Sequence, residues 1–136
     1  MDAKRFIIDE IAAMESGDID RVCSMFAEDC VLIDVTTSEV VHGRAGIRRI
    51  CETTYEAFSD LRHEDMRLIA EGHTVVGQFE IVATHTGELL GYAPTGRRLR
   101  FRACSVFDLN ESNDQIKKET YYHDAVGLAA QLKGEG

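Results

Sequence analysis

Two runs of apolar residues near the start of the chain repeat with the 3.6-residue period of a helix. The first run consists of Ile7, Ile8, Ile11 and Ala12, and the second of Ile19, Val22, Cys23 and Phe26. Between the runs lies the tripeptide Ser-Gly-Asp, in which Gly17 can end one helix and Asp18 can cap the next. The pattern therefore predicts two successive helices, each with one buried face.

The next apolar run is rich in β-branched residues and has no helical period. The segment 30–35, Cys-Val-Leu-Ile-Asp-Val, is followed by four polar residues and then by Val-Val-His at 40–42, which predicts a β-hairpin. After Gly43 the helical period returns for three turns and predicts a third helix over residues 45–58. Its apolar face is formed by Ile47, Ile50, Cys51, Tyr55 and Phe58.

Beyond the third helix the apolar period changes from 3.6 to 2, which is the period of a strand. Four strands are predicted, at residues 62–70, 74–86, 97–109 and 115–124, and residues 127–132 predict a short closing helix. Strands that follow one another directly pair antiparallel. Helices followed by long antiparallel strands predict an α+β fold, in which a twisted sheet wraps around the N-terminal helices and leaves a concave space.

The alternation of apolar and polar residues along the 97–109 strand predicts which side chains face inward and which face outward. The inward face is predicted to carry Leu99, Phe101, Ala103, Ser105 and Phe107, and the outward face Arg98, Arg100 and Arg102. The arginine row is expected to be a solvated or subunit-facing ladder, because a nucleic-acid groove would need aromatic side chains on that face. On the preceding strand, His85 shares the parity of Phe79, Ile81 and Ala83, which places it at the inner edge of the concave space.

Alternation leaves the last strand ambiguous, because both of its faces carry an aromatic residue and an acid. One face carries Thr120, Tyr122 and Asp124, and the other carries Glu119, Tyr121 and His123. A carboxyl group in an apolar cavity has a raised pKa, which suits acid-base chemistry near neutral pH. A shift of one residue in the pairing exchanges the two sets.

Two aspartates have a structural interpretation beside the catalytic one. Asp124 either faces the concave space or caps the closing helix. Asp34 is either a second inward carboxylate or a turn residue bonded to Thr36 or Thr37.

Charge and cysteine content narrow the classes of partner. The 136 residues, with 15 basic and 24 acidic side chains and a net charge of −9, are expected to form a single domain that binds neither nucleic acid nor membranes. The four cysteines lie in apolar runs without CxxC spacing, which favours free thiols and a cytoplasmic location.

His42, His63 and His73 lie at element ends or in turns, where we expect them to be solvated, and no metal site is expected.

The segment 85–97, His-Thr-Gly-Glu-Leu-Leu-Gly-Tyr-Ala-Pro-Thr-Gly-Arg, contains the one proline of the chain and three of its eleven glycines. It is longer than the usual hairpin connection of about two to five residues. We therefore predict that it forms the rim of a pocket.

Together with SGDID, VVHGRAGIR, AFSDLR and the terminal DAVGLAAQL, this loop resembles the SnoaL-like polyketide cyclase family, within the nuclear transport factor 2-like superfamily. The resemblance covers residues 5–132. It implies a cone-shaped, curved and mostly antiparallel sheet (a cystatin-like roll), a helical lid over a hydrophobic cavity, and a homodimer formed through the outer sheet face.

The resemblance also implies chemistry. Cyclases of the family use an aspartate on the final strand as acid-base group for an aldol closure, which corresponds to Asp124. The chain departs from the family pattern at Thr120, which replaces an aromatic residue, at Tyr121, which replaces an acid, and at Ser105, where some cyclases carry a histidine.

Two hypotheses of function follow, with a scaffolding role through the outer sheet face as a third. The first is an enzyme that acts without a cofactor on a small apolar cyclic ketone or polyketide-like molecule, with Asp124, His85 and Tyr121 as catalytic residues. Its substrate-binding residues would be Asp34, Tyr55, Phe101, Ser105 and Tyr122. The second is a protein that binds such a molecule without converting it.

Overall fold

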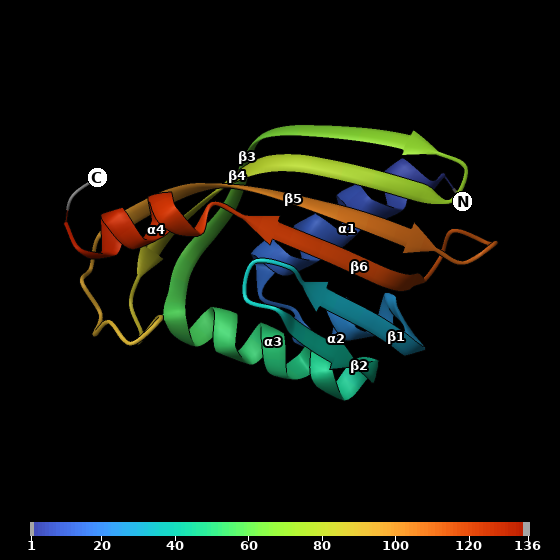
Figure 1. Cartoon of the computed structure of the whole chain (residues 1–136). Coiled ribbons are helices and arrows are strands. Elements are labelled where there is room, and N and C mark those ends of the chain that lie inside the picture. The colour runs from blue at the N-terminus through green and yellow to red at the C-terminus, as the bar shows by residue number, and fades with distance from the viewer. Residues whose placement is uncertain (1, 135–136) are drawn as a thin grey trace.

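The structure is a computed structural model that describes residues 2–134, and within that range the chain forms four helices and six strands (Figure 1). The helices are α1 (Ala3–Ser16), α2 (Ile19–Ser24), α3 (Gly43–Ala57) and α4 (Ala125–Leu132). The strands are β1 (Phe26–Asp34), β2 (Glu39–His42), β3 (Phe58–Glu71), β4 (Thr74–His85), β5 (Arg98–Leu109) and β6 (Ile116–His123).

Local sequence signals define the two N-terminal helices. Asp2 caps α1 by accepting hydrogen bonds from two backbone N–H groups of the first turn. Gly17 ends this helix in the left-handed conformation, with φ of 76°. Asp18 then caps α2 by accepting from the N–H of Arg21. The predicted boundary between the two helices is thereby confirmed.

The second helix is shorter than its apolar stripe predicted. It ends at Ser24, and Phe26 begins β1 instead of continuing the helix. Phe26 is 2% exposed and pairs with Ile116 of β6. Placing Phe26 on the helix was wrong, because pairing and burial within the sheet outweigh the helical period.

The strands form one sheet in the order β2-β1-β6-β5-β4-β3. The consecutive strands β3, β4, β5 and β6 pair antiparallel, as predicted from their short links. Strands β1 and β6 pair in parallel, although they are far apart in the sequence. This pair joins the N-terminal hairpin to the rest of the sheet, and an argument from sequence neighbours does not predict it.

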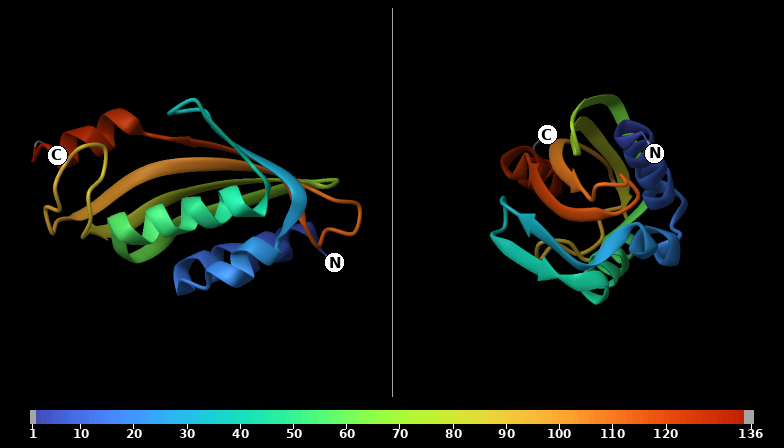
Figure 2. Two further views of the ribbon diagram at one scale, coloured as in Figure 1. Left: turned by 90° about the horizontal axis from the view of Figure 1, so that it is seen from below. Right: turned by 90° about the vertical axis from the view of Figure 1, so that its right-hand side faces the viewer.

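The long strands arch over α1 and α3 and give the sheet a concave face (Figure 2). The residues predicted to face inward on β5 are all buried, with exposed fractions from 0% at Leu99 to 6% at Phe101. Their side chains form the core together with apolar residues of the N-terminal helices. The predicted fold, an α+β domain with a curved and mostly antiparallel sheet around N-terminal helices, is confirmed.

The outward face of β5 carries the predicted arginine ladder. Arg100 forms ion pairs with Glu64 on β3, at 2.7 Å, and with Glu80 on β4. Arg102 lies 3.9 Å from the same Glu80. The arginines of these pairs are exposed to solvent, so water and salt screen the ion pairs and they contribute little to stability.

Strand β3 follows α3 without a loop and begins earlier than the predicted start at residue 62. Its first residue, Phe58, pairs with His85 at the end of β4. The early start places His63 well inside the strand, opposite Ile81, instead of at its beginning.

The 85–97 loop is fastened at its start to the junction of α3 and β3. The N–H groups of Thr86 and Gly87 both donate to the carbonyl of Ala57, at 2.9 and 3.1 Å, where α3 meets β3. A Cβ atom on Gly87 would lie 1.8 Å from the carbonyl oxygen of Glu56. Glycine is therefore required at this position because two backbone segments are in contact.

All four cysteines are free thiols, and three of them are buried. No helix within residues 2–134 has both the length and the apolar composition needed to cross a membrane.

Replacing Gly87 with alanine should destabilise the protein by about 1 to 3 kcal/mol, because the added methyl group forces the loop away from the end of α3. The matched control is Thr86→Ala, since Thr86 is exposed and its backbone hydrogen bond is retained. Urea unfolding of both variants provides the measurement. Equal stability of the two variants would contradict the close contact at Gly87.

Candidate active site

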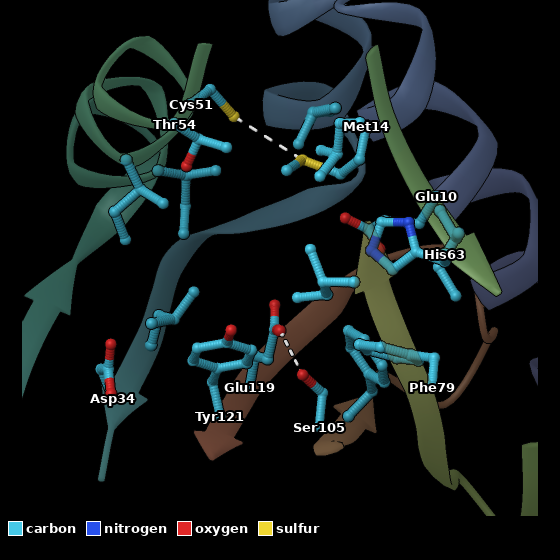
Figure 3. A pocket seen from close by; sticks show the side chains of 18 of the residues that line it. Glu10, Met14, Asp34, Cys51, Thr54, His63, Phe79, Ser105, Glu119 and Tyr121 are labelled. Carbon is cyan, nitrogen blue, oxygen red and sulfur yellow. Dashed lines mark hydrogen bonds between the residues drawn. The ribbon is translucent and has the colours of Figure 1, made fainter. Parts of the chain in front are cut away.

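A cavity of about 230 Å³ lies between the concave face of the sheet and the helices α1 and α3 (Figure 3). Most of its wall is apolar, and the aromatic part consists of Phe26, Phe58, Phe79, Phe101, Phe107 and Tyr121. The other polar side chains that line it are Glu10, Asp34, Glu39, Thr54, His63, Ser105 and Glu119. The cavity is therefore an apolar space with a small number of polar groups, as is typical of small-molecule sites.

The pairing of β6 with β5 decides which face of the last strand lines the cavity. Tyr121 lies opposite Ser105, and Glu119 lies opposite Phe107, so these two residues share the inward face of the sheet. Tyr122 lies on the other face and is 43% exposed. The ambiguity of the sequence pattern is thus resolved in favour of the face that carries Glu119 and Tyr121.

Glu119 is a carboxyl group at the centre of this apolar wall. The hydroxyl of Ser105 donates to its Oε2 at 2.9 Å. Burial raises the pKa of Glu119 to about 7, although the hydrogen bond from Ser105 acts in the opposite direction. Near neutral pH the group is therefore present in both the acid and the carboxylate form.

Glu10 enters the same cavity from α1 and is 5% exposed. Within residues 2–134 its carboxyl group receives no hydrogen bond and forms no ion pair. Burial, and secondly the charge of Glu119, raise the pKa of Glu10 well above its usual value. Burial therefore favours the acid form of Glu10, and in that form its carboxyl group can donate a hydrogen bond into the cavity.

His63 also lines the cavity, held by Glu15 of α1. Its Nδ1 lies 3.0 Å from Oε2 of Glu15, and the same oxygen accepts the backbone N–H of His63. The side chain is 9% exposed, and burial lowers the pKa of His63 more than Glu15 raises it. The prediction of a solvated histidine was wrong, because β3 begins earlier than the sequence pattern indicated.

Tyr121 and Asp34 lie side by side at the β1 side of the cavity (Figure 3). Burial, followed by the charges of Asp34 and Glu119, raises the pKa of Tyr121, so its phenol stays protonated and can donate. Oδ1 of Asp34 accepts the N–H of Thr37 at 3.1 Å. Both interpretations of Asp34 therefore hold, since this residue shapes the turn and also lines the cavity.

Of the residues proposed for the site from the sequence, the structure brings together Asp34, Phe101, Ser105 and Tyr121. The others, among the residues that the structure describes, are not part of the cavity wall. Asp124 is exposed and caps α4 by accepting the N–H of Gly127 at 2.9 Å. Tyr55 donates its hydroxyl to the carbonyl of Met14 at 2.7 Å, and Tyr122 faces outward.

His85 is fully buried but serves the loop instead of the cavity. Its Nδ1 accepts the N–H of Thr95 at 3.2 Å and lies 2.9 Å from the hydroxyl of the same residue. Its backbone bonds to Arg97 and Gly96 close the loop. The histidine of the predicted rim thus fixes the conformation of the 85–97 segment.

Sequence reasoning missed Glu10, His63 and Glu15, and it did not choose Glu119. A signal for Glu10 was present, because this acid interrupts the apolar helix stripe formed by Phe6, Ile7, Ile11 and Met14. An acidic residue is rarely placed on the buried face of a helix unless it has a function there. Within residues 2–134 no group of three His, Cys, Asp or Glu side chains is arranged to hold a metal ion.

Comparison with solved structures places this architecture among known proteins. A candidate SnoaL-like polyketide cyclase from Shewanella putrefaciens CN-32 superimposes with a TM-score of 0.88 at 15% identity, covering 97% of this chain and 96% of the other. IdmH, a candidate polyketide cyclase from Streptomyces antibioticus, gives 0.83 at 21% identity, covering 98% and 99%. AclR, a candidate hydroxylase from Streptomyces galilaeus, gives 0.84 at 22% identity, covering 97% and 81%.

At these identities the structural similarity establishes the fold and leaves the reaction open. Among proteins with curated descriptions, none matches this chain in sequence. The family model described as SnoaL-like polyketide cyclase matches residues 4–132, which is nearly the whole chain. The chain therefore belongs to the SnoaL-like polyketide cyclase family.

Proposed function

We propose that this protein is an enzyme that moves a proton within a small, uncharged carbonyl compound, without a cofactor, and that Glu119 is its acid-base group. One observation carries the proposal. Glu119 lies in an apolar cavity, bonded to Ser105, with a pKa of about 7. A group whose pKa lies near the working pH is present in both protonation states. It can therefore both accept and donate a proton efficiently.

The surrounding groups suit the charge that such a reaction develops. In its carboxylate form Glu119 can remove a proton from the carbon next to a carbonyl, so that the electron pair of the broken C–H bond moves onto the carbonyl oxygen. In its acid form it can return a proton to carbon. The phenol of Tyr121 and, in its acid form, the carboxyl group of Glu10 are donors that can stabilise the resulting enolate. Return of the proton to another carbon gives an isomer, and attack of the enolate carbon on a second carbonyl closes a ring.

Cavity size and charge define the class of substrate. The volume of about 230 Å³ is below the range of about 300 to 1,000 Å³ found for drug-sized ligands. Four acids and neither lysine nor arginine belong to the described cavity wall. A compact molecule without carboxylate or phosphate groups therefore fits best, since an anion would face like charges.

Binding without turnover is the second candidate function. It is favoured by the position of Asp124, the acid that the family resemblance implies as catalytic, because its carboxylate caps α4 outside the cavity wall. In that case Glu119 and Tyr121 would only hold the polar group of the ligand.

Replacing Glu119 with glutamine should lower the rate of proton transfer by about 100-fold or more, because the amide can neither accept nor deliver the proton. The measurement is the incorporation of deuterium from D₂O into a panel of small cyclic ketones, followed by NMR. Glu111→Gln is the control, since Glu111 is an exposed loop residue. Exchange at the wild-type rate in the Glu119 variant would exclude the proposed role, and binding without exchange by the wild type would favour the second function.

The raised pKa of Glu119 also predicts how stability depends on pH. Because the pKa is near 4.5 in the unfolded chain and about 7 in the folded one, the folded state binds the proton more tightly. The stabilisation that comes from this bound proton is fully present below pH 4.5 and is lost as the pH rises through 7. Between pH 5 and pH 8 the free energy of unfolding should therefore fall by about 2 kcal/mol.

Urea unfolding at the two pH values tests this dependence. Glu119→Gln should lose less stability than the wild type between pH 5 and pH 8, because the amide does not ionise. Parallel pH profiles of the two proteins would show that Glu119 has an ordinary pKa in the folded state.

A further inference from the structure

The contact between Glu15 and His63 joins the helix layer to the sheet. Glu15 lies on α1 and His63 on β3, and one carboxylate oxygen receives both the backbone N–H of His63 and its ring nitrogen Nδ1. A carboxylate can only accept hydrogen bonds, so Nδ1 carries the ring proton. The neutral ring therefore presents Nε2 as an unprotonated acceptor.

The ring is fixed in place at the edge of the cavity. The rings of His63 and Phe79 meet edge to face, with centroids 4.8 Å apart and an interplanar angle of 83°. Nε2 has no hydrogen-bond partner within residues 2–134, although the ring lines the cavity. A contact that only held α1 against the sheet would need Nδ1 alone. Nε2 is a second, oriented acceptor on a ring that lines the cavity, and this indicates a ligand.

The charged and titratable groups around His63 come from two elements. Glu15 and Glu10 lie on α1, and Glu119 lies on β6, while the neighbouring strand β4 contributes the apolar Phe79 and Ile81. Figure 3 shows His63 and Glu10 on the α1 side of the cavity and Glu119 with Ser105 on the β5 and β6 side. A molecule in the cavity would thus lie between a histidine base and a carboxylic acid.

Resting on the function proposed above, we infer that His63, positioned by Glu15, is a second catalytic residue, and that it works with Glu119 to shift a proton between two atoms of an enolisable ketone. Nε2 of His63 takes a proton from one carbon, and the electron pair of that C–H bond shifts through the conjugated system. The acid form of Glu119 delivers its proton to the far carbon, which gives the isomeric ketone.

The cycle closes without a co-reactant. After the transfer His63 carries an extra proton and Glu119 lacks one, and exchange with water restores both groups. Product and substrate are isomers, so neither oxidant nor reductant is consumed. Glu15 is bonded to His63 and does not belong to the described cavity wall, so it is a positioning residue.

The test uses cyclohex-3-en-1-one as the probe, because its conversion to the conjugated enone is followed by ultraviolet absorbance. The wild-type rate should be bell-shaped in pH, falling on the acid side as His63 gains a proton and on the alkaline side as Glu119 loses one. His63→Gln should lower the rate at least 100-fold and remove the acid limb. His73→Gln is the matched control, since His73 is exposed and bonds to Asn113 outside the cavity.

Glu15→Gln separates positioning from a merely structural role. Loss of the Glu15 charge lowers the pKa of His63 further, so the acid limb should move to lower pH while some activity remains. A structural contact alone would reduce stability and leave the shape of the profile unchanged, which would overturn the inference.

A measurement on the folded wild type keeps the inference testable if a variant does not fold. Side-chain ¹⁵N shifts of His63 should show a protonated Nδ1 and an unprotonated Nε2 at pH 7, and the opposite tautomer or an imidazolium would overturn the assignment. Loss of activity in Glu119→Gln with a wild-type profile in His63→Gln would reject His63 and keep the proposed function. Absence of both isomerisation and deuterium exchange in the wild type would reject both.

Discussion

Glu10 and Glu119, two of the four acids that line the apolar cavity, have strongly raised pKa values, and this arrangement constrains the rest of the structure. Glu119 on the sheet and Glu10 on α1 are both enclosed, and the charge of one disfavours ionisation of the other. Burying one ionised group in such surroundings is costly, and burying two is more so. Burial therefore favours the acid form of Glu10, and Glu119 accepts a hydrogen bond from Ser105. Perturbed carboxyl groups of this kind cluster at functional sites.

The fold supplies the walls that make this burial possible. Long strands curve over α1 and α3, and the inward positions of β4 and β5 close the floor with aromatic side chains. The parallel pairing of β1 with β6 brings Asp34 next to Tyr121. The contact of Glu15 with His63 fixes α1 against β3 at the opposite side. Acid-base groups from the helix layer and from the sheet thus face one space, although they are distant in the sequence.

The sequence predicted the fold in most respects and the site only in part. Period-2 alternation correctly assigned the faces of β5, because a strand with one buried face leaves a clear pattern. The same reasoning could not choose between Glu119 and Asp124, since both faces of β6 carry an acid and its register depends on pairing with β5. His63 was missed because β3 extends back to Phe58, where α3 ends without a loop signal. Long-range pairing, which local pattern does not encode, decided each of these points.

The pKa of Glu119 tests the central claim most directly. Carboxyl carbon NMR shifts of the glutamates, assigned with Glu119→Gln, would follow this one group between pH 3 and 9 in the intact protein. We predict a titration midpoint near 7, with the carboxyl group still protonated at pH 5. A midpoint near the ordinary value of 4.5 would show that the cavity does not disfavour the charge. In that case Glu119 would be a permanent carboxylate, and the acid-base role assigned to it would be contradicted.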